Sequence, residues 1–108
     1  MITYSVLYPN LEGKRFDMDY YCNKHLPMVR DRLGAACKGV VVQAGMSGLE
    51  PGSKPTYIAM AHLYFDSIEA YRAAFAPHVP EFRADIPNYT DIEPTRQISE
   101  VLVQAGVS

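Results

Sequence analysis

Alternating and continuous apolar stretches along the chain predict four β-strands. Residues 2–8 alternate between an apolar and a more polar face, and Pro9 ends this stretch. Residues 38–46 and 56–65 are strand-like runs on either side of a loop that is rich in glycine and proline. The third run has no polar face, which predicts burial on both of its sides. The fourth strand is expected over residues 95–103.

A helical pattern follows the first strand, over residues 17–33. Asp17 is a suitable N-cap, and Gly34 supplies a C-terminal stop. At about 100° per residue, one face of this helix is apolar apart from a single histidine. The inward face consists of Met18, Tyr21, Cys22, His25 and Val29. Pro27 falls on the outward side, where solvent compensates for the lost hydrogen bond, so we expect a bend rather than a break.

A second helical pattern follows the third strand. Asp66, with Glu69 three residues later, resembles a capping box. The apolar positions then recur every three or four residues and form one stripe: Ile68, Tyr71, Phe75, Val79, Phe82 and Ile86. Pro77 lies away from this stripe, so the helix is expected to bend outward or to break there.

The order of elements is strand, helix, strand, strand, helix, strand. This order predicts an α+β fold of the ferredoxin-like type, with a four-stranded antiparallel sheet and two helices on one face, in a single domain over residues 1–108. Two helices cover only one face of such a sheet, so the apolar residues on the other face of the third strand need a partner. We expect a second copy to supply it, as a homodimer packed through the open sheet face.

Composition and charge narrow the expected partners. The formal net charge is −2, and neither the ten Lys and Arg nor the twelve Asp and Glu form a run. Nucleic acid and anionic membranes are therefore not expected partners, because both require clustered basic residues. The chain shows no secretory signal pattern and no stretch of ~18 apolar residues, which predicts a cytoplasmic protein.

The cysteines and histidines form no ligand motif of recognised spacing. We therefore expect no metal, and the absence of dinucleotide fingerprints and phosphate-binding glycine loops predicts no cofactor. Cys22 and Cys37 are expected to be reduced, since nothing in the chain indicates an oxidising compartment. Because Cys22 falls on the inward face of its helix, we interpret it as a small buried hydrophobe rather than a nucleophile.

His25 is the most informative residue, because it lies at the centre of an inward apolar stripe. The ordinary pKa of an imidazole is about 6.5, so a histidine beside a cavity is a candidate acid, base or ligand anchor. The alternative is a core histidine whose nitrogens are satisfied by Tyr21 or by a backbone carbonyl. Tyr21 lies one turn earlier on the same face, where its hydroxyl is placed either to orient the imidazole or to fill the core.

Two segments carry a resemblance to a known family. Residues 16–29, FDMDYYCNKHLPMV, resemble the first-helix signature of the EthD family of dimeric α/β barrel proteins, through a tyrosine pair, a histidine and a proline. Residues 64–101 resemble the second half of that family. The resemblance implies a dimeric α/β barrel with a cavity between helices and sheet. It also implies a place in small-molecule or xenobiotic catabolism, as in the degradation of ethyl tert-butyl ether, where a cytochrome P450 system performs the oxidation.

The resemblance places the candidate site in that cavity, with His25 as the expected catalytic residue. The expected substrate-binding residues are Tyr4, Tyr21, His62 and Phe75. His62 shares a strand face with Tyr64, and that face is either the cavity side or the dimer seam, with packing at the seam favoured. Asp91 is the nearest expected carboxylate if its turn folds over the cavity, and capping of the turn explains it equally well. His78 is expected to be exposed or to border the second helix.

Three functions are open from the sequence. The first is cofactor-independent chemistry on a small apolar oxygenated molecule, as an oxidoreductase, isomerase or lyase, in which His25 moves a proton and Tyr21 holds an oxygen. The second is a non-catalytic carrier that binds a hydrophobic intermediate beside a P450 system. The third is a dimeric structural module whose interior is filled by aromatic side chains.

Overall fold

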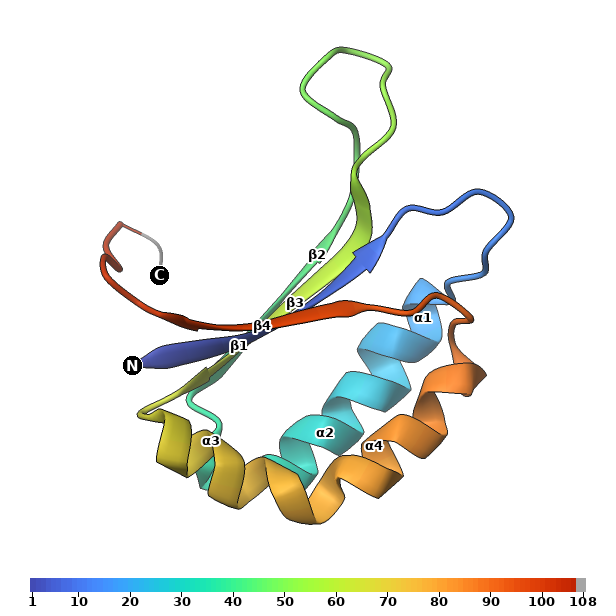
Figure 1. Cartoon of the computed structure of the whole chain (residues 1–108). Coiled ribbons are helices and arrows are strands. Elements are labelled where there is room, and N and C mark those ends of the chain that lie inside the picture. The colour runs from blue at the N-terminus through green and yellow to red at the C-terminus, as the bar shows by residue number, and fades with distance from the viewer. Residues whose placement is uncertain (107–108) are drawn as a thin grey trace.

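The computed structural model describes residues 1–106 and shows a sheet with the helices packed against one of its faces (Figure 1). The strands pair antiparallel in the order β2-β3-β1-β4. They are β1 (Ile2–Pro9), β2 (Gly39–Ala44), β3 (Tyr57–Phe65) and β4 (Thr95–Glu100). The predicted α+β, ferredoxin-like fold with helices on one sheet face is therefore confirmed.

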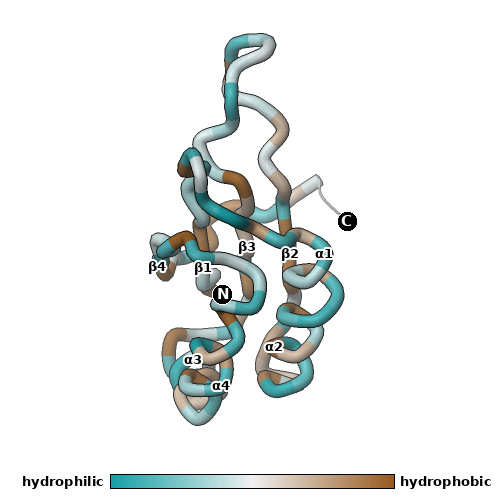
Figure 2. The backbone as a smooth tube through the Cα atoms, turned by 90° about the vertical axis from the view of Figure 1, so that its right-hand side faces the viewer, coloured by the Kyte–Doolittle hydropathy of each residue, from teal (hydrophilic) through white to brown (hydrophobic). Residues whose placement is uncertain are grey.

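Two helical segments form the second layer and lie side by side against the sheet (Figure 2). The first comprises α1 (Met18–Tyr20), the π-helical turn η1 (Tyr21–His25), α2 (Leu26–Leu33) and the 3₁₀ turn η2 (Gly34–Ala36). The second comprises α3 (Ile68–Phe75), the 3₁₀ turn η3 (Ala76–His78), α4 (Val79–Asp85) and the 3₁₀ turn η4 (Ile86–Asn88). The predicted break at Pro77 is confirmed by η3. Within residues 1–106, none of these helices has the length and apolar character to cross a bilayer.

The two helical segments begin at side-chain caps. Asp17 accepts a hydrogen bond from the Tyr20 amide at 3.1 Å, as predicted for an N-cap. In the second segment the cap is Ser67, whose hydroxyl accepts from the Ala70 amide at 3.0 Å. The predicted cap at Asp66 is wrong by one residue, because the extended backbone that places a cap side chain over the first turn occurs at Ser67.

The distortion expected at Pro27 takes the form of a π-helical turn immediately before it. The Leu26 amide donates to the Tyr21 carbonyl five residues back, and Pro27, which has no N–H to donate, follows in the first turn of α2. Each residue of a π turn rotates less than in an α-helix, so Tyr21 and His25 both face the core, at 2% and 6% exposure. The same change carries Cys22 to the surface, so the prediction that Cys22 is buried is wrong.

Within one chain, β3 buries a single face. The residues that face the helices are fully buried: Ala59, Ala61, Leu63 and Phe65. Their alternating neighbours are only half-buried: Ile58, Met60, His62 and Tyr64. The prediction that β3 is buried on both sides is therefore not met inside one chain, because the helices cover only one face of the sheet.

β4 ends at Glu100, three residues before its predicted end. Its neighbour β1 begins opposite Glu100, and the last bond of the pair runs from the Val101 amide to the Met1 carbonyl at 3.0 Å. Beyond that bond the described chain is no longer paired in the sheet, and Leu102 is 82% exposed. β2 is also shorter than predicted, because it covers only Gly39–Ala44.

One residue of the second predicted apolar stripe is not buried. Ile68, expected to face inward, is the first residue of α3 and is 36% exposed.

Gly34 provides a test of how the first helical segment ends. Its φ of 61° and ψ of −142° lie in a region that is nearly closed to residues with a side chain. We expect Gly34→Ala to lower the free energy of unfolding by about 1–3 kcal/mol in urea denaturation. Gly39→Ala is the matched control, because its backbone is ordinary and an added Cβ meets Tyr64 at an unstrained 3.7 Å. An equal loss of stability in both variants would contradict this explanation.

Candidate functional site

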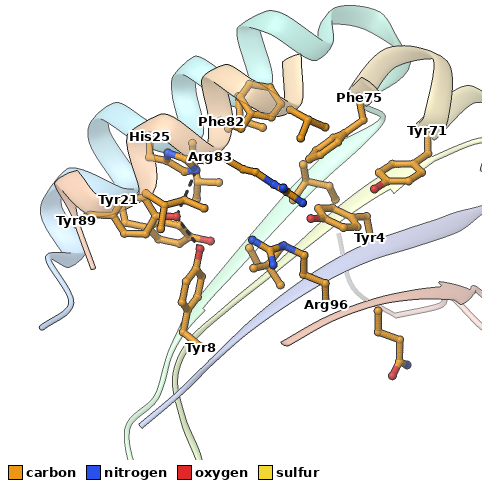
Figure 3. Close-up of a pocket in the computed structure, with 18 of the residues that line it drawn as sticks. Tyr4, Tyr8, Tyr21, His25, Tyr71, Phe75, Phe82, Arg83, Tyr89 and Arg96 are labelled. Atoms are coloured by element: carbon orange, nitrogen blue, oxygen red, sulfur yellow. Dashed lines mark hydrogen bonds between the residues drawn. The ribbon is translucent and has the colours of Figure 1, made fainter. Parts of the chain in front are cut away.

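A cavity of about 450 Å³ lies between the helices and the sheet (Figure 3). Its wall is mostly aromatic and aliphatic. The aromatic side chains that face it come from both layers, and they include Tyr4, Tyr8, Tyr21, Phe75, Phe82 and Tyr89. A volume of this size with an apolar wall and a few convergent polar groups is typical of a small-molecule site.

His25 lies in the cavity wall and is paired with a carboxylate from the other helical segment. Its Nδ1 is 2.8 Å from Oδ2 of Asp85, the last residue of α4, and its side chain is 8% exposed. The Asp85 carboxylate also accepts from the Tyr20 hydroxyl at 2.6 Å and from the Asn88 amide at 2.9 Å. Three donors thus hold the carboxylate in place, and the carboxylate in turn orients the imidazole.

A chain of hydroxyl groups continues from the other imidazole nitrogen. The Tyr89 hydroxyl lies 3.4 Å from His25 Nε2, and the hydroxyls of Tyr89 and Tyr8 are 2.6 Å apart. Tyr89 is fully buried and follows η4, whereas Tyr8 comes from β1. The connected groups therefore run from Asp85 through His25 and Tyr89 to Tyr8 at the sheet side of the cavity. Figure 3 shows the part from His25 to Tyr8.

Burial and hydrogen bonding set the protonation states along this chain. Burial lowers the pKa of His25, and the hydrogen bond and charge of Asp85 offset only part of that effect, so the imidazole is neutral at pH 7. Burial acts to raise the pKa of Asp85, but its hydrogen-bond donors outweigh burial and hold that pKa below its usual value. Burial raises the pKa of Tyr8 and of Tyr89, so both hydroxyls keep their protons.

These states determine the tautomer of the histidine. Because the ionised Asp85 carboxylate can only accept, the proton of the neutral ring is on Nδ1, and Nε2 carries the lone pair. The Tyr89 hydroxyl therefore donates to Nε2, and the Tyr8 hydroxyl donates to the Tyr89 oxygen. The arrangement can accept a proton at the cavity wall and store it on a buried imidazole beside an anion.

Four of the five residues predicted for the site line the cavity: Tyr4, Tyr21, His25 and Phe75. The Tyr21 ring stacks on the His25 ring, with centroids 5.7 Å apart and an interplanar angle of 14°. Burial raises the pKa of Tyr21 well above its ordinary value, so its phenol is neutral. The Tyr4 ring packs on the Phe75 ring at 4.9 Å, farther along the cavity.

The structure separates other candidate residues from this cavity. His62 lies on the opposite face of the sheet, where its Nδ1 is 2.7 Å from the Ser5 hydroxyl, so it is not among the cavity residues. Asp91 is exposed and accepts from the Arg15 amide at 2.8 Å, which is a loop contact. His78 is half-buried and its ring stacks on Phe82 at 5.8 Å. Among residues 1–106, no group of three potential ligand side chains is placed to hold a metal ion.

The sequence reasoning missed Asp85, Tyr89 and Tyr8 as partners of His25. The alternation of the first strand could have indicated Tyr8, because it falls on the same strand face as Tyr4. The sequence gives a weaker indication of Asp85, which directly precedes Ile86 of the second apolar stripe. Tyr89 follows the helix in a turn, where no periodicity indicates the direction of a side chain.

The EthD domain family matches residues 12–93 of the chain, which is well over half of its length. The chain belongs to the EthD family. No curated protein sequence matches this EthD chain significantly. The solved structure of an EthD-like protein from Ralstonia eutropha JMP134 is 47% identical to it, covers 96% of this chain and 94% of that chain, and superposes with a TM-score of 0.92.

Two more distant structures share the fold of this EthD chain. An EthD family protein from Bacillus halodurans C-125 is 20% identical, covers 94% of this chain and 99% of that chain, and has a TM-score of 0.67. A protein from Arabidopsis thaliana is 16% identical, covers 97% of this chain and 99% of that chain, and also has a TM-score of 0.67. At this level of identity, the two structures bear on the fold alone.

A pH titration of this EthD chain tests the pairing of His25 with Asp85. Asp85→Asn removes the charge that supports the imidazolium and leaves burial in place, so we expect the pKa of His25 to fall further below 6.5. NMR of the imidazole carbon-bound protons against pH measures this shift. Asp91→Asn is the matched control and should leave the His25 titration unchanged. A His25 pKa that is the same in Asp85→Asn and in the unmodified chain would contradict the pairing.

Proposed function

We propose that this EthD chain catalyses cofactor-independent proton transfer on a small, mostly apolar, oxygen-bearing molecule in the cavity. The observation that carries the proposal is the hydrogen-bonded chain from the ionised Asp85 through the neutral His25 to the Tyr89 and Tyr8 hydroxyls. A neutral imidazole that is oriented by a carboxylate is a general base suited to pH 7. The cavity disfavours the alternative of a module with a filled interior.

The proton moves in one connected step. A proton next to a substrate carbonyl passes to the Tyr8 oxygen, while the Tyr8 proton passes to Tyr89 and the Tyr89 proton passes to Nε2 of His25. The electron pair of the broken bond stays on the substrate as an enolate. The imidazolium that forms is stabilised by the Asp85 carboxylate 2.8 Å away.

The fate of the enolate determines the class of reaction. Return of the proton to another substrate atom is an isomerisation, and expulsion of a leaving group is a lyase reaction. Reaction of the enolate with dioxygen would make the protein an oxidoreductase. In each case Tyr21, which lies beside the imidazole, is placed to hold a substrate oxygen, while Tyr4 and Phe75 pack against the apolar body.

A non-catalytic carrier is the second candidate function. The observation that favours it is the apolar character of the cavity wall, whose deepest hydroxyls are bonded to each other rather than left free. Such a protein would bind a hydrophobic intermediate beside a P450 system and release it unchanged. It predicts saturable binding that survives conservative change at His25.

We also propose that the protein works in the cytoplasm on a free small molecule. Cys22 and Cys37 are both free thiols, as suits a reducing compartment. The ten basic residues form no run, which disfavours nucleic acid and anionic membranes as partners.

The open sheet face supports a homodimer. This face carries the half-buried Met60, His62 and Tyr64 of β3, and Val41 of β2, which is 43% exposed. The Ser5–His62 hydrogen bond holds the imidazole on this face and satisfies one of its polar atoms. A second copy packed sheet to sheet would remove the apolar surface of Met60, Tyr64 and Val41 from water, which is the main driving force for such association.

Exchange of the α-protons of 2-tetralone in D₂O tests the proton-transfer proposal by NMR. We expect the unmodified chain to accelerate exchange, and we expect His25→Gln and Tyr8→Phe to lose about 10²- to 10⁴-fold of the rate, the range of general acid–base assistance. His62→Gln and Tyr64→Phe are matched controls on the opposite sheet face and should retain the rate.

Circular dichroism checks that each variant used in the proton-exchange measurement is folded. Saturable 2-tetralone binding without exchange, unchanged in folded His25→Gln, would instead support the carrier. Exchange at the full rate in folded His25→Gln would contradict the role of the histidine.

Val41→Asp tests the dimer. A carboxylate on the open face would have to be desolvated between two sheets, so we expect the variant to be monomeric where the unmodified chain is dimeric, as measured by analytical ultracentrifugation. Leu11→Asp, at a 47% exposed position in the loop after β1, is the matched control and should remain dimeric. A monomeric unmodified chain, or an unchanged mass in Val41→Asp, would contradict packing through this face.

A further inference from the structure

Among residues 1–106, those that line the cavity include two arginines and no carboxylate. Arg83 belongs to α4 and Arg96 to β4, so the two side chains reach the cavity from opposite layers (Figure 3). With His25 neutral, the other residues that line the cavity within the described chain are uncharged. This part of the molecule is therefore positively charged, in a protein whose formal net charge is −2.

Each arginine is placed by a local feature of the sequence. In the β1–β4 register Arg96 pairs with Val6, so its side chain is on the sheet face that the helices cover. β4 is an edge strand, which leaves Arg96 partly exposed. Arg83 directly follows Phe82, the buried residue of α4, and is exposed beside it. The guanidinium groups of Arg83 and Arg96 therefore lie where the cavity meets solvent, and the aromatic side chains line its interior.

Neither guanidinium is neutralised by a firm ion pair. Arg96 approaches the Glu93 carboxylate only to 4.0 Å, and the Glu93 side chain is 93% exposed, so water screens this pair. Arg83 forms no ion pair within residues 1–106. Both side chains point into the same part of the cavity, beside Tyr4 (Figure 3). An anion between them would relieve the repulsion of two like charges and accept their hydrogen bonds.

Tyr4 marks the place where these charges act. Burial raises the pKa of the Tyr4 hydroxyl, and the nearby Arg96 and Arg83 oppose that increase. In Figure 3 the Tyr4 side chain lies beside both arginine side chains, so its hydroxyl offers a further donor to an anion. Next to it, Tyr71 and Phe75 pack on the Tyr4 ring at 5.0 and 4.9 Å, which provides an aromatic surface for an apolar group.

We propose that the substrate is an apolar or aromatic monocarboxylate whose carboxylate binds between Arg83 and Arg96. This proposal rests on the proposed function, because it names the substrate class of the same cavity. The planar guanidinium donors match the two oxygens of a carboxylate. With the carboxylate held at the open side, the apolar body extends along the aromatic wall toward the Tyr8 hydroxyl and His25. The charged end thereby fixes which substrate atom meets the proton acceptor.

Binding of 2-naphthoate and of its neutral analogue 2-naphthamide, measured by isothermal titration calorimetry, tests this assignment. We expect the unmodified chain to bind the carboxylate at least about tenfold more tightly than the amide, as for a hydrogen bond to a charged group. Arg83→Gln and Arg96→Gln should each lose most of that preference. Arg30→Gln, which removes an exposed arginine from the outer side of α2, is the matched control and should keep it.

The outcomes separate this proposal from the proton-transfer proposal. Folded His25→Gln should keep the preference for 2-naphthoate, because the imidazole is not part of the anion site. If the unmodified chain prefers 2-naphthoate over 2-naphthamide but does not accelerate the exchange of 2-tetralone, the proposed substrate class is retained and the proton-transfer proposal is refuted. The carboxylate site would be overturned if the unmodified folded chain bound 2-naphthoate no more tightly than 2-naphthamide, or did not bind 2-naphthoate at all. It would also be overturned if the Arg83→Gln, Arg96→Gln double variant kept the full preference for 2-naphthoate.

Discussion

The buried imidazole of His25 is the group on which the arrangement of this molecule depends. Its two nitrogens must find partners, because a buried polar atom without a hydrogen bond costs about 1–3 kcal/mol. One partner, Asp85, ends α4, and the other, Tyr89, follows η4 and reaches Tyr8 of β1. The first helical segment, the second helical segment and the sheet are thus held together by the same short run of hydrogen bonds.

The hydrogen-bonded groups from Asp85 to Tyr8 are surrounded by aromatic side chains, and their buried polar atoms all have hydrogen-bond partners. Within residues 1–106 no buried side-chain nitrogen or oxygen lacks a partner. Tyr21 and Tyr89 pack on the His25 ring with centroids 5.7 and 4.6 Å away, so water has little access to the imidazole. In such surroundings hydrogen bonds are electrostatically stronger than in water. The same surroundings explain why a histidine beside a carboxylate stays neutral here, because desolvation of the imidazolium outweighs the attraction of Asp85.

The cavity has two chemically different parts because two different constraints shape it. The part beside His25 is made by elements that pack closely, so its polar groups are neutral hydroxyls and the shielded pair of His25 and Asp85. The part beside Arg83 and Arg96 includes residues of β4, an edge strand that the helices leave partly exposed, and solvated arginines are accommodated there at little cost. A molecule with one apolar and one anionic part matches this division. The opposite face of the sheet has no such cover, and its half-buried residues are the reason to propose a second copy.

The sequence by itself determined the order of elements, the fold class and the inward position of His25, Tyr21 and Tyr4. All of these follow from periodicities of two or 3.6 residues that are readable within short windows. Only the tertiary structure decided that Asp85, 60 residues away, is the partner of His25, because the pairing depends on how two helical segments pack. Only the structure placed Cys22 outside, since a π turn breaks the α-helical period locally. The local sequence pattern determines which face of a helix or strand is apolar. Which polar side chains form hydrogen bonds between the helices and the sheet depends on how these elements pack, and no local pattern contains those distances.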